Sequence, residues 1–162
     1  MKELAASAVA TLEAVAQARE LQIDLTCEED VPLICDAQFV RRSIENLLSN
    51  AIKYSQSGGT IEVAVRNQGS TIMLSVADCG DGIPNPMKYT LFEKFGSVEA
   101  RGGNQRRGVG LGLYLVRLVA EAHGGGVSVH DGPVRGTVFT LSFPRLGPAE
   151  RDFKAPGRSA NT

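Results

Sequence analysis

The sequence predicts an α/β fold, a two-layer α/β sandwich in which three helices cover one face of a mixed, mostly antiparallel sheet. Three segments have apolar residues at helical spacing, and two pairs of segments alternate apolar and polar residues on either side of a short turn. The 162 residues suit one compact domain with its own core.

Helix and strand alternate in the N-terminal part of the chain. Residues 3–20 are good helix formers with apolar side chains at helical spacing, and residues 21–25 alternate as a strand does. The apolar pair at residues 33–34 suggests a second, brief strand. Asp36 is a typical N-cap for a long helix that is expected to end near Tyr54.

Two hairpins and one further helix are expected in the remainder. The strands of these hairpins are predicted over residues 60–66 with 71–77 and 127–130 with 137–143. Residues 80–107 are rich in Gly, Pro, Asn and basic residues and predict a long loop, which in a compact domain usually has a function. Residues 111–122 predict a helix that three glycines end.

Composition argues against several classes of function. The net charge of -1 provides no bulk attraction to nucleic acid or to an anionic membrane, and 6% aromatic residues without Trp do not suit a base-stacking surface. No apolar run approaches the roughly 20 residues of a membrane span, and no signal peptide is evident. Cys27, Cys35 and Cys79 lack paired or metal-type spacing and are expected to be reduced thiols. We expect a cytoplasmic location, with no nucleic-acid partner and no direct membrane contact.

The helix predicted to end near Tyr54 carries polar side chains that core packing does not need. Asn46, Asn50 and Lys53 share a narrow arc, with Tyr54 at its edge, separate from the apolar arc. An amide oxygen suits Mg²⁺, which takes few protein ligands beside substrate phosphates, and lysine suits phosphate oxygens. Tyr54 can pack on a nucleotide. A solvated helix face explains this one segment equally well.

A second segment, an aspartate–glycine turn, follows the strand over residues 71–77. Asp78 ends that strand, and a carboxylate there can accept a hydrogen bond from an exocyclic amine. Gly80 and Gly82 let the backbone approach a flat ring. Taken alone, the motif is more simply a plain turn.

A third segment is the glycine run at residues 108–112, which leads directly into a helix. Backbone amides at such a helix start attract anions. The run lacks the spacing of the dinucleotide fingerprint, and neither a P-loop lysine nor the downstream motifs of eukaryotic-type kinases follow.

Together and in this order, the three segments resemble the catalytic ATP-binding domain of bacterial two-component sensor histidine kinases, a relative of the gyrase and MutL ATPases. The resemblance covers roughly residues 20–144. It implies the Bergerat ATP-binding fold with Mg²⁺ and ATP as cofactors. It also implies donation of the γ-phosphate to a histidine of a dimerisation domain, and indirectly to a response regulator.

The resemblance also assigns roles to residues. It implies that Asn50 is the Mg²⁺ ligand, that Asn46 and Lys53 attend the phosphates, and that Asp78 binds the adenine amino group. Independently of the resemblance, the loop carries positive charge at Lys94, Arg101, Arg106 and Arg107, which could neutralise charge that develops during phosphoryl transfer; for any single arginine, a solvated basic loop is an equally good explanation. Asn46, Lys53 and Arg107 are the candidate catalytic residues. The residues expected to contact the nucleotide are Asn46, Asn50, Lys53, Tyr54, Asp78, Gly80, Gly82, Ile83, Phe92, Lys94, Gly108, Gly110, Leu111, Gly112, Leu113 and Thr137.

Two departures refine this interpretation. Gyrase-type ATPases and anti-sigma serine kinases have a glutamate four residues before the metal-binding asparagine, whereas this chain has Asn46. Glu45, the residue before Asn46, lies about 100° around the helix from it and is expected to point away from the nucleotide. We therefore expect the chain to lack a built-in base that activates water. Cys79 stands where the family usually has Asn, and this difference is not expected to abolish nucleotide binding.

Phe92 and Phe95 match the family's F box and are expected to anchor the loop to the body of the domain.

The chain has no evident phospho-accepting histidine, because His123 and His130 are both expected to be structural. Residues 1–20 would then be the end of a preceding dimerisation helix or linker, residues 21–146 the ATP-binding catalytic domain, and residues 147–162 a disordered tail. The alternatives are a stand-alone ATPase or anti-sigma serine kinase, and a non-catalytic nucleotide-binding module.

Overall fold

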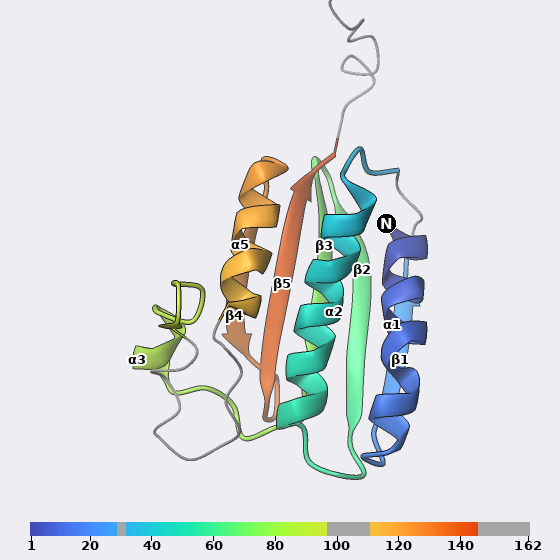
Figure 1. The fold of residues 1–162 in the computed structure, drawn as a ribbon, viewed down its shortest axis with the longest axis vertical. Coiled ribbons are helices and arrows are strands. Elements are labelled where there is room, and N and C mark those ends of the chain that lie inside the picture. Colours follow the sequence, from blue (N-terminus) through green and yellow to red (C-terminus); the bar gives the residue numbers. More distant parts are fainter. Residues whose placement is uncertain (29–31, 97–110, 146–162) are drawn as a thin grey trace, which may run out of the picture.

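Three helices pack on one face of a single five-stranded sheet (Figure 1). The structure is a computed structural model, which describes residues 1–28, 32–96 and 111–145. The covering helices are α1 (Lys2–Gln17), α2 (Ala37–Tyr54) and α5 (Gly112–Ala122). The short helix α3 (Asn85–Lys88) lies beside this layer, within the segment that the sequence predicted to be a loop. The two-layer α/β sandwich is therefore confirmed.

The strand order across the sheet is β1-β2-β3-β5-β4. The strands are β1 (Gln22–Cys27), β2 (Thr60–Gln68), β3 (Thr71–Ala77), β4 (Gly126–Asp131) and β5 (Thr137–Pro144). Strand β1 runs parallel to β2, and every other neighbouring pair is antiparallel, so the sheet is mixed and mostly antiparallel as predicted.

The brief strand predicted at residues 33–34 is wrong. No strand is assigned there, and Ile34 is 75% exposed. Pro32 lacks the amide donor that a ladder needs, and Asp36 already begins the cap of α2. These residues form the approach to α2.

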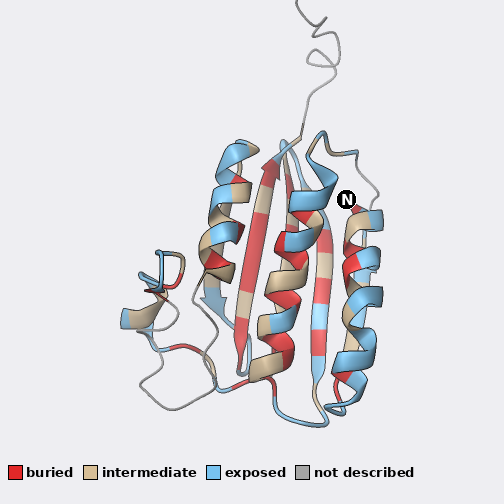
Figure 2. Ribbon diagram, viewed as in Figure 1, coloured by how far each residue is buried: buried red, intermediate tan, exposed pale blue. Residues whose placement is uncertain are grey.

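The core lies between the sheet and the helices, and Figure 2 shows buried residues both on the central strands and on faces of the covering helices. Alternate side chains of β2, β3 and β5 face the helices, and the apolar arc predicted for α2 is buried against them. The buried members of the α2 arc are Val40, Ile44, Leu47, Leu48 and Ala51. This burial orients the opposite, polar arc of α2 away from the sheet.

Helix α1 shares this core. Its buried residues Ala5, Ala8 and Ala16 belong to the same hydrophobic cluster as those of α2, and α1 packs against α2 and β1. The division into residues 1–20, the end of a preceding helix or linker, and residues 21–146, the catalytic domain, stays a prediction. The predicted tail at residues 147–162, like the later part of the predicted loop, lies outside the described residues.

His123 joins the end of α5 to the beginning of α2. Its Nδ1 lies 2.7 Å from the carbonyl oxygen of Val119, and its Nε2 accepts a hydrogen bond from the Asp36 amide at 3.0 Å. The ring also packs edge-on against Phe143, with ring centroids 6.1 Å apart. With Nε2 as acceptor, the proton of the neutral ring lies on Nδ1. The expectation that His123 is structural is confirmed.

We predict that His123→Ala lowers the free energy of unfolding by about 1–3 kcal/mol, because it leaves two backbone groups without their partner. Urea denaturation followed by circular dichroism measures this. The control His130→Ala removes an exposed side chain on β4 and should change stability by less than about 0.5 kcal/mol. Equal stability of the two variants would contradict the role of His123.

Candidate functional site

The polar arc of α2 forms one wall of the candidate site. Asn46, Asn50, Lys53 and Tyr54 are all half-buried, and the two asparagines lie one turn apart on one helix face. The Nζ atom of Lys53 lies 5.0 Å from the centre of the Tyr54 ring. Two amide groups and one ammonium group are thus presented along a single rigid element.

The beginning of α5 lies against the first asparagine of this arc. A Cβ atom placed on Gly112 would lie 3.4 Å from Oδ1 of Asn46. Leu111 is the N-cap residue of α5, and Leu113 is buried in the core with 5% exposure. The structure therefore brings the last glycine of the glycine run to Asn46. Gly108, Gly110 and Arg107 lie outside the described residues.

The carboxylate of Asp78 is held by backbone amides from two segments. Its Oδ1 atom accepts hydrogen bonds from the amides of Gly80 at 2.9 Å and Thr137 at 3.1 Å. The Asp78 amide in turn donates to the Thr137 carbonyl at 2.9 Å. Asp78 is 9% exposed and Thr137 is 2% exposed. This fixed carboxylate is what recognition of an exocyclic amine requires.

Close packing of the backbone explains why two positions near this carboxylate, Gly80 and Gly136, are glycine. A Cβ atom on Gly80 would lie 2.5 Å from the carbonyl oxygen of Tyr54, and one on Gly136 would lie 1.9 Å from the carbonyl oxygen of Asp78. Both distances are far below van der Waals contact, so neither position accepts a side chain. The turn after β3 is pressed between the end of α2 and the turn before β5.

Helix α2 thus spans both ends of the candidate site. Asn46 meets α5, while Tyr54, eight residues later, meets the turn at Gly80. Eight residues correspond to about 12 Å along a helix. This separation has the scale of a nucleoside triphosphate. Gly82 and Ile83 continue from the turn, with Ile83 7% exposed.

The F-box segment is anchored differently from the prediction. Phe92 packs edge-on against Phe139 of β5, with ring centroids 6.1 Å apart, so its anchoring role is confirmed. Phe95 is 46% exposed, so the expectation is wrong for this residue. Its ring lies instead beside Lys94, whose Nζ is 5.5 Å from the ring centre. Leu91, which is 1% exposed, provides the second anchor.

The nearest acidic side chain on α2 is engaged in an ion pair. Glu45 Oε1 lies 2.5 Å from Nη1 of Arg41, one turn earlier on the helix. Cys27, Cys35 and Cys79 are free thiols, as expected. Burial raises the pKa of the Cys35 thiol, with a smaller increase from Asp36 and an opposing effect of the N-terminal amine.

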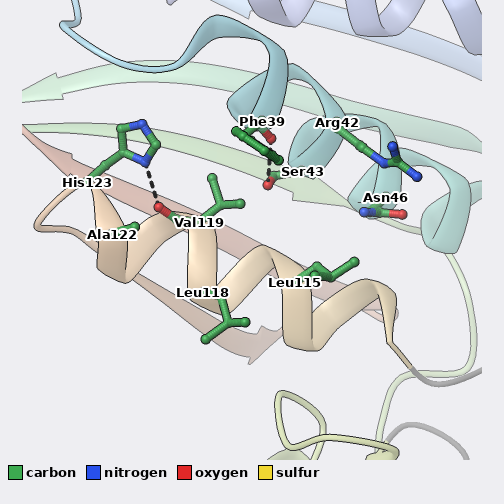
Figure 3. A pocket seen from close by; sticks show the side chains of 9 residues that line it. All are labelled: Phe39, Arg42, Ser43, Asn46, Leu115, Leu118, Val119, Ala122 and His123. Atoms are coloured by element: carbon green, nitrogen blue, oxygen red, sulfur yellow. Dashed lines mark hydrogen bonds between the residues drawn. The ribbon is translucent and has the colours of Figure 1, made fainter.

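A groove of about 510 Å³ lies between α2 and α5 (Figure 3). Its α5 side is apolar and open to solvent, with Leu115 44% and Leu118 40% exposed. Arg42 and Asn46 line it from α2. The full lining consists of Phe39, Arg42, Ser43, Asn46, Leu115, Leu118, Val119, Ala122 and His123. Asn46 therefore belongs both to the polar arc and to this groove.

Within the described ranges, no group of three or more His, Cys, Asp or Glu side chains could hold a metal ion. A cation at this site would depend on the amide oxygens of α2 and on phosphate oxygens. That donor set fits Mg²⁺, which is commonly bound through few protein groups and substrate phosphates. Among the described helices, none has the length and apolar character needed to cross a bilayer.

Sequence reasoning missed two residues that hold the turn after β3. The Cys79 amide donates to Oγ of Ser55 at 3.3 Å. The Cys79 carbonyl accepts from Nε and Nη2 of Arg135, at 3.0 and 2.6 Å. Ser55 directly follows the predicted Tyr54 and was within reach of a motif search. Arg135 lies 56 residues away in the chain and has no local signal.

Comparison with known proteins identifies the family. The family described as histidine kinase-, DNA gyrase B-, and HSP90-like ATPases matches residues 35–147. The chain belongs to this family. It is an ATPase domain of the histidine-kinase type, because its curated relatives in this family are sensor kinases.

Among these relatives, the alginate biosynthesis sensor protein KinB of Pseudomonas aeruginosa is 35% identical over 129 residues, which are 79% of this chain and 21% of KinB. The probable sensor kinase SilS of Salmonella typhimurium is 40% identical over 111 residues, which are 68% of this chain and 22% of SilS. The chain therefore spans about a fifth of the length of these relatives.

Solved structures agree with the fold. The mycobacterial sensor histidine kinase MprB matches with a TM-score of 0.75 and 29% identity, over 89% of this chain and 95% of that one. The catalytic domain of histidine kinase ThkA, in a nucleotide-free form, matches with a TM-score of 0.78 and 22% identity, over 90% of this chain and 94% of that one. ThkA has also been solved in complex with the response regulator protein TrrA.

We predict that Asp78→Asn raises the dissociation constant for ADP at least about tenfold, because the amide keeps the shape but loses the charged acceptor. Displacement of a fluorescent ADP analogue measures this. Asp81→Asn is the matched control, because Asp81 is exposed and its Oδ1 accepts a hydrogen bond from the exposed Gln56 at 2.9 Å, away from the Asp78 carboxylate. Parent-like affinity of Asp78→Asn would exclude Asp78 from base recognition.

Proposed function

We propose that this domain binds Mg-ATP and donates the γ-phosphate to a histidine on a dimerisation domain of a two-component sensor kinase. The observation that carries the proposal is the amide at Asn46, one turn before Asn50 and against Gly112. A related ATPase that activates water would need a carboxylate at this position. Glu45 does not replace it, since its carboxylate pairs with Arg41.

Each residue of the candidate site has a role in this proposal. Asp78, oriented by the amides of Gly80 and Thr137, accepts a hydrogen bond from the adenine amino group. Asn50 holds Mg²⁺, and Asn46 and Lys53 attend the phosphates. Tyr54, Ile83 and Phe92 pack around the nucleoside, and the amides at residues 111–113 face the phosphates. Lys94 and Arg107 add positive charge.

The reaction is a phosphoryl transfer to a ring nitrogen. A bond forms between that nitrogen and the γ-phosphorus while the bond from phosphorus to the bridging oxygen breaks, and ADP leaves with the electron pair. The proton of the ring passes to the partner domain or to solvent. Mg²⁺, when bound, neutralises charge on the β- and γ-oxygens. This chain contributes binding and orientation, and the one acidic side chain of α2, Glu45, is paired with Arg41 and is not available as a base for water.

The groove between α2 and α5 is a suitable docking surface for a helix of the partner domain. Its exposed Leu115 and Leu118 offer apolar surface in the groove that Asn46 also lines, and the γ-phosphate is proposed to lie near Asn46. A helix that carries the accepting histidine and covers these leucines would bring the ring to that end of the groove. The relatives are several times longer than this chain, which leaves room for such a domain in the parent protein.

Two further elements belong to the proposal. The phosphate then passes from the histidine to a response regulator, in keeping with the ThkA–TrrA complex. The domain lies in the cytoplasm, where ATP is available, whether or not the parent protein has a membrane anchor.

We predict that Asn50→Ala lowers phosphoryl transfer to an added histidine-bearing dimerisation domain by at least about 100-fold, because an oxygen ligand that supports charge neutralisation is removed. Transfer of ³²P from labelled ATP measures this. Ser49→Ala, an exposed neighbour on the same helix, is the control and should retain parent activity. Unimpaired transfer by Asn50→Ala would reject the proposal.

We predict that Leu118→Asp lowers transfer to the added domain by about tenfold or more while ATP affinity changes less than about twofold, since a charge at a docking surface opposes burial. Transfer and nucleotide affinity are measured on the same preparation. Leu118→Met keeps the apolar surface and should behave like the parent. Full transfer by Leu118→Asp would exclude the groove as the docking surface.

A further inference from the structure

The turn between β4 and β5 reaches back to the segment that follows β3. The amide of Gly132 donates to the carbonyl of Gly136 at 3.0 Å, which closes the turn. Gly136 has a φ of +84°, and its backbone lies against the carbonyl of Asp78. The turn therefore brings Arg135, the last of the three residues between these glycines, to the edge of the candidate base-binding site.

The guanidinium of Arg135 makes two hydrogen bonds to one carbonyl. Its Nε and Nη2 atoms both donate to the carbonyl oxygen of Cys79, at 3.0 and 2.6 Å. That carbonyl shares a peptide unit with the amide of Gly80, which donates to Oδ1 of Asp78 at 2.9 Å. A trans peptide unit is planar, and its carbonyl and amide point in opposite directions. Holding the carbonyl therefore aims the amide.

The preceding peptide unit, between Asp78 and Cys79, is held by a second element. The Cys79 amide donates to Oγ of Ser55, which caps the end of α2 and is 5% exposed. The end of helix α2 and the β4–β5 turn thus both hold the backbone of Cys79. Of the described side chains that hydrogen-bond to this backbone, Ser55 is neutral and Arg135 is charged.

The charge of Arg135 also acts through the peptide unit. A cation on the carbonyl polarises the unit and makes its amide a stronger donor, since hydrogen bonds in series strengthen one another. The amide of Gly80 then holds the Asp78 carboxylate more firmly. A lysine could supply the charge but not the two-pronged contact of the guanidinium.

We propose that Arg135 is a positioning residue for base recognition, which orients the carboxylate of Asp78 through the Cys79–Gly80 peptide unit. This inference rests on the proposed function, which supplies the adenine nucleotide as the ligand. The orientation of the Asp78 carboxylate is a property of the protein without nucleotide. Arg135 does not touch the base in this proposal. Removal of the Arg135 side chain should weaken the binding of adenosine, ADP and ATP by the same factor. The three ligands share the adenine base, and the proposed role of Arg135 concerns recognition of the base and not of the phosphates.

The test compares Arg135→Ala, Arg135→Lys and the control Arg66→Ala, an exposed arginine of β2 that pairs with Glu28. The first measurement is the amide resonance of Gly80 in the ¹H–¹⁵N NMR spectrum without nucleotide. The second is the dissociation constant for adenosine and for ATP.

We expect Arg135→Ala to shift the Gly80 amide proton upfield and to raise both dissociation constants about fivefold to tenfold, with Arg135→Lys between Ala and the parent. Arg66→Ala should leave both readouts unchanged. Thermal unfolding of each variant separates these effects from a general loss of stability, which would not single out Gly80.

Three results would overturn the inference. They are an unchanged Gly80 resonance in Arg135→Ala, a loss of affinity confined to ATP with adenosine unaffected, and parent-like affinity for both ligands. If the parent chain itself bound neither ligand, the proposed function would fail, and the Gly80 resonance of the free protein would still decide the role of Arg135.

Discussion

Two backbone amides converge on one carboxylate oxygen of Asp78, and the geometry of the candidate site depends on this convergence. One amide belongs to the turn directly after β3, and the other belongs to Thr137 at the start of β5. Pairing of β3 with β5 sets Ala77 opposite Val138, which brings Asp78 level with Thr137. A shift of this register by one residue would turn alternate side chains to the other face and dissolve the contact.

The same carboxylate connects the sheet with the helical layer. Gly80 packs on the backbone of Tyr54, so the end of α2 abuts the turn, while Asn46 meets α5 at Gly112. A rigid helix thereby relates the proposed base end to the proposed phosphate end. In the proposed function, the amide at Asn46 supplies no base for water, and the γ-phosphate is donated to a histidine of another domain. On that proposal, transfer would depend on docking of the two domains.

Local patterns predicted the elements best. The 3.6-residue period of α2 separated Val40 and Leu47 from Asn46 and Asn50, and the structure buries the first pair and leaves the second half-buried. Alternation predicted the two hairpins in the same way. The strand predicted from the apolar pair at residues 33–34 was wrong, because so short an apolar run does not by itself specify a strand.

Long-range contacts could not be predicted from these patterns. The hydrogen bonds of Arg135 to Cys79 join residues 56 positions apart, and they depend on strand order and on the close approach of Gly136. The exposure of Phe95 likewise depends on how the F-box segment turns, since its φ is +68° and Leu91 takes the buried place. Motif resemblance identified the candidate residues but not what orients them.

The most direct test of the account is a calorimetric titration of this chain with ATP, performed with and without Mg²⁺. The account predicts binding of one nucleotide per chain that strengthens when Mg²⁺ is present, since the phosphates and the amide oxygens of α2 share the cation. A folded chain that releases no heat and binds no ATP under either condition would contradict it.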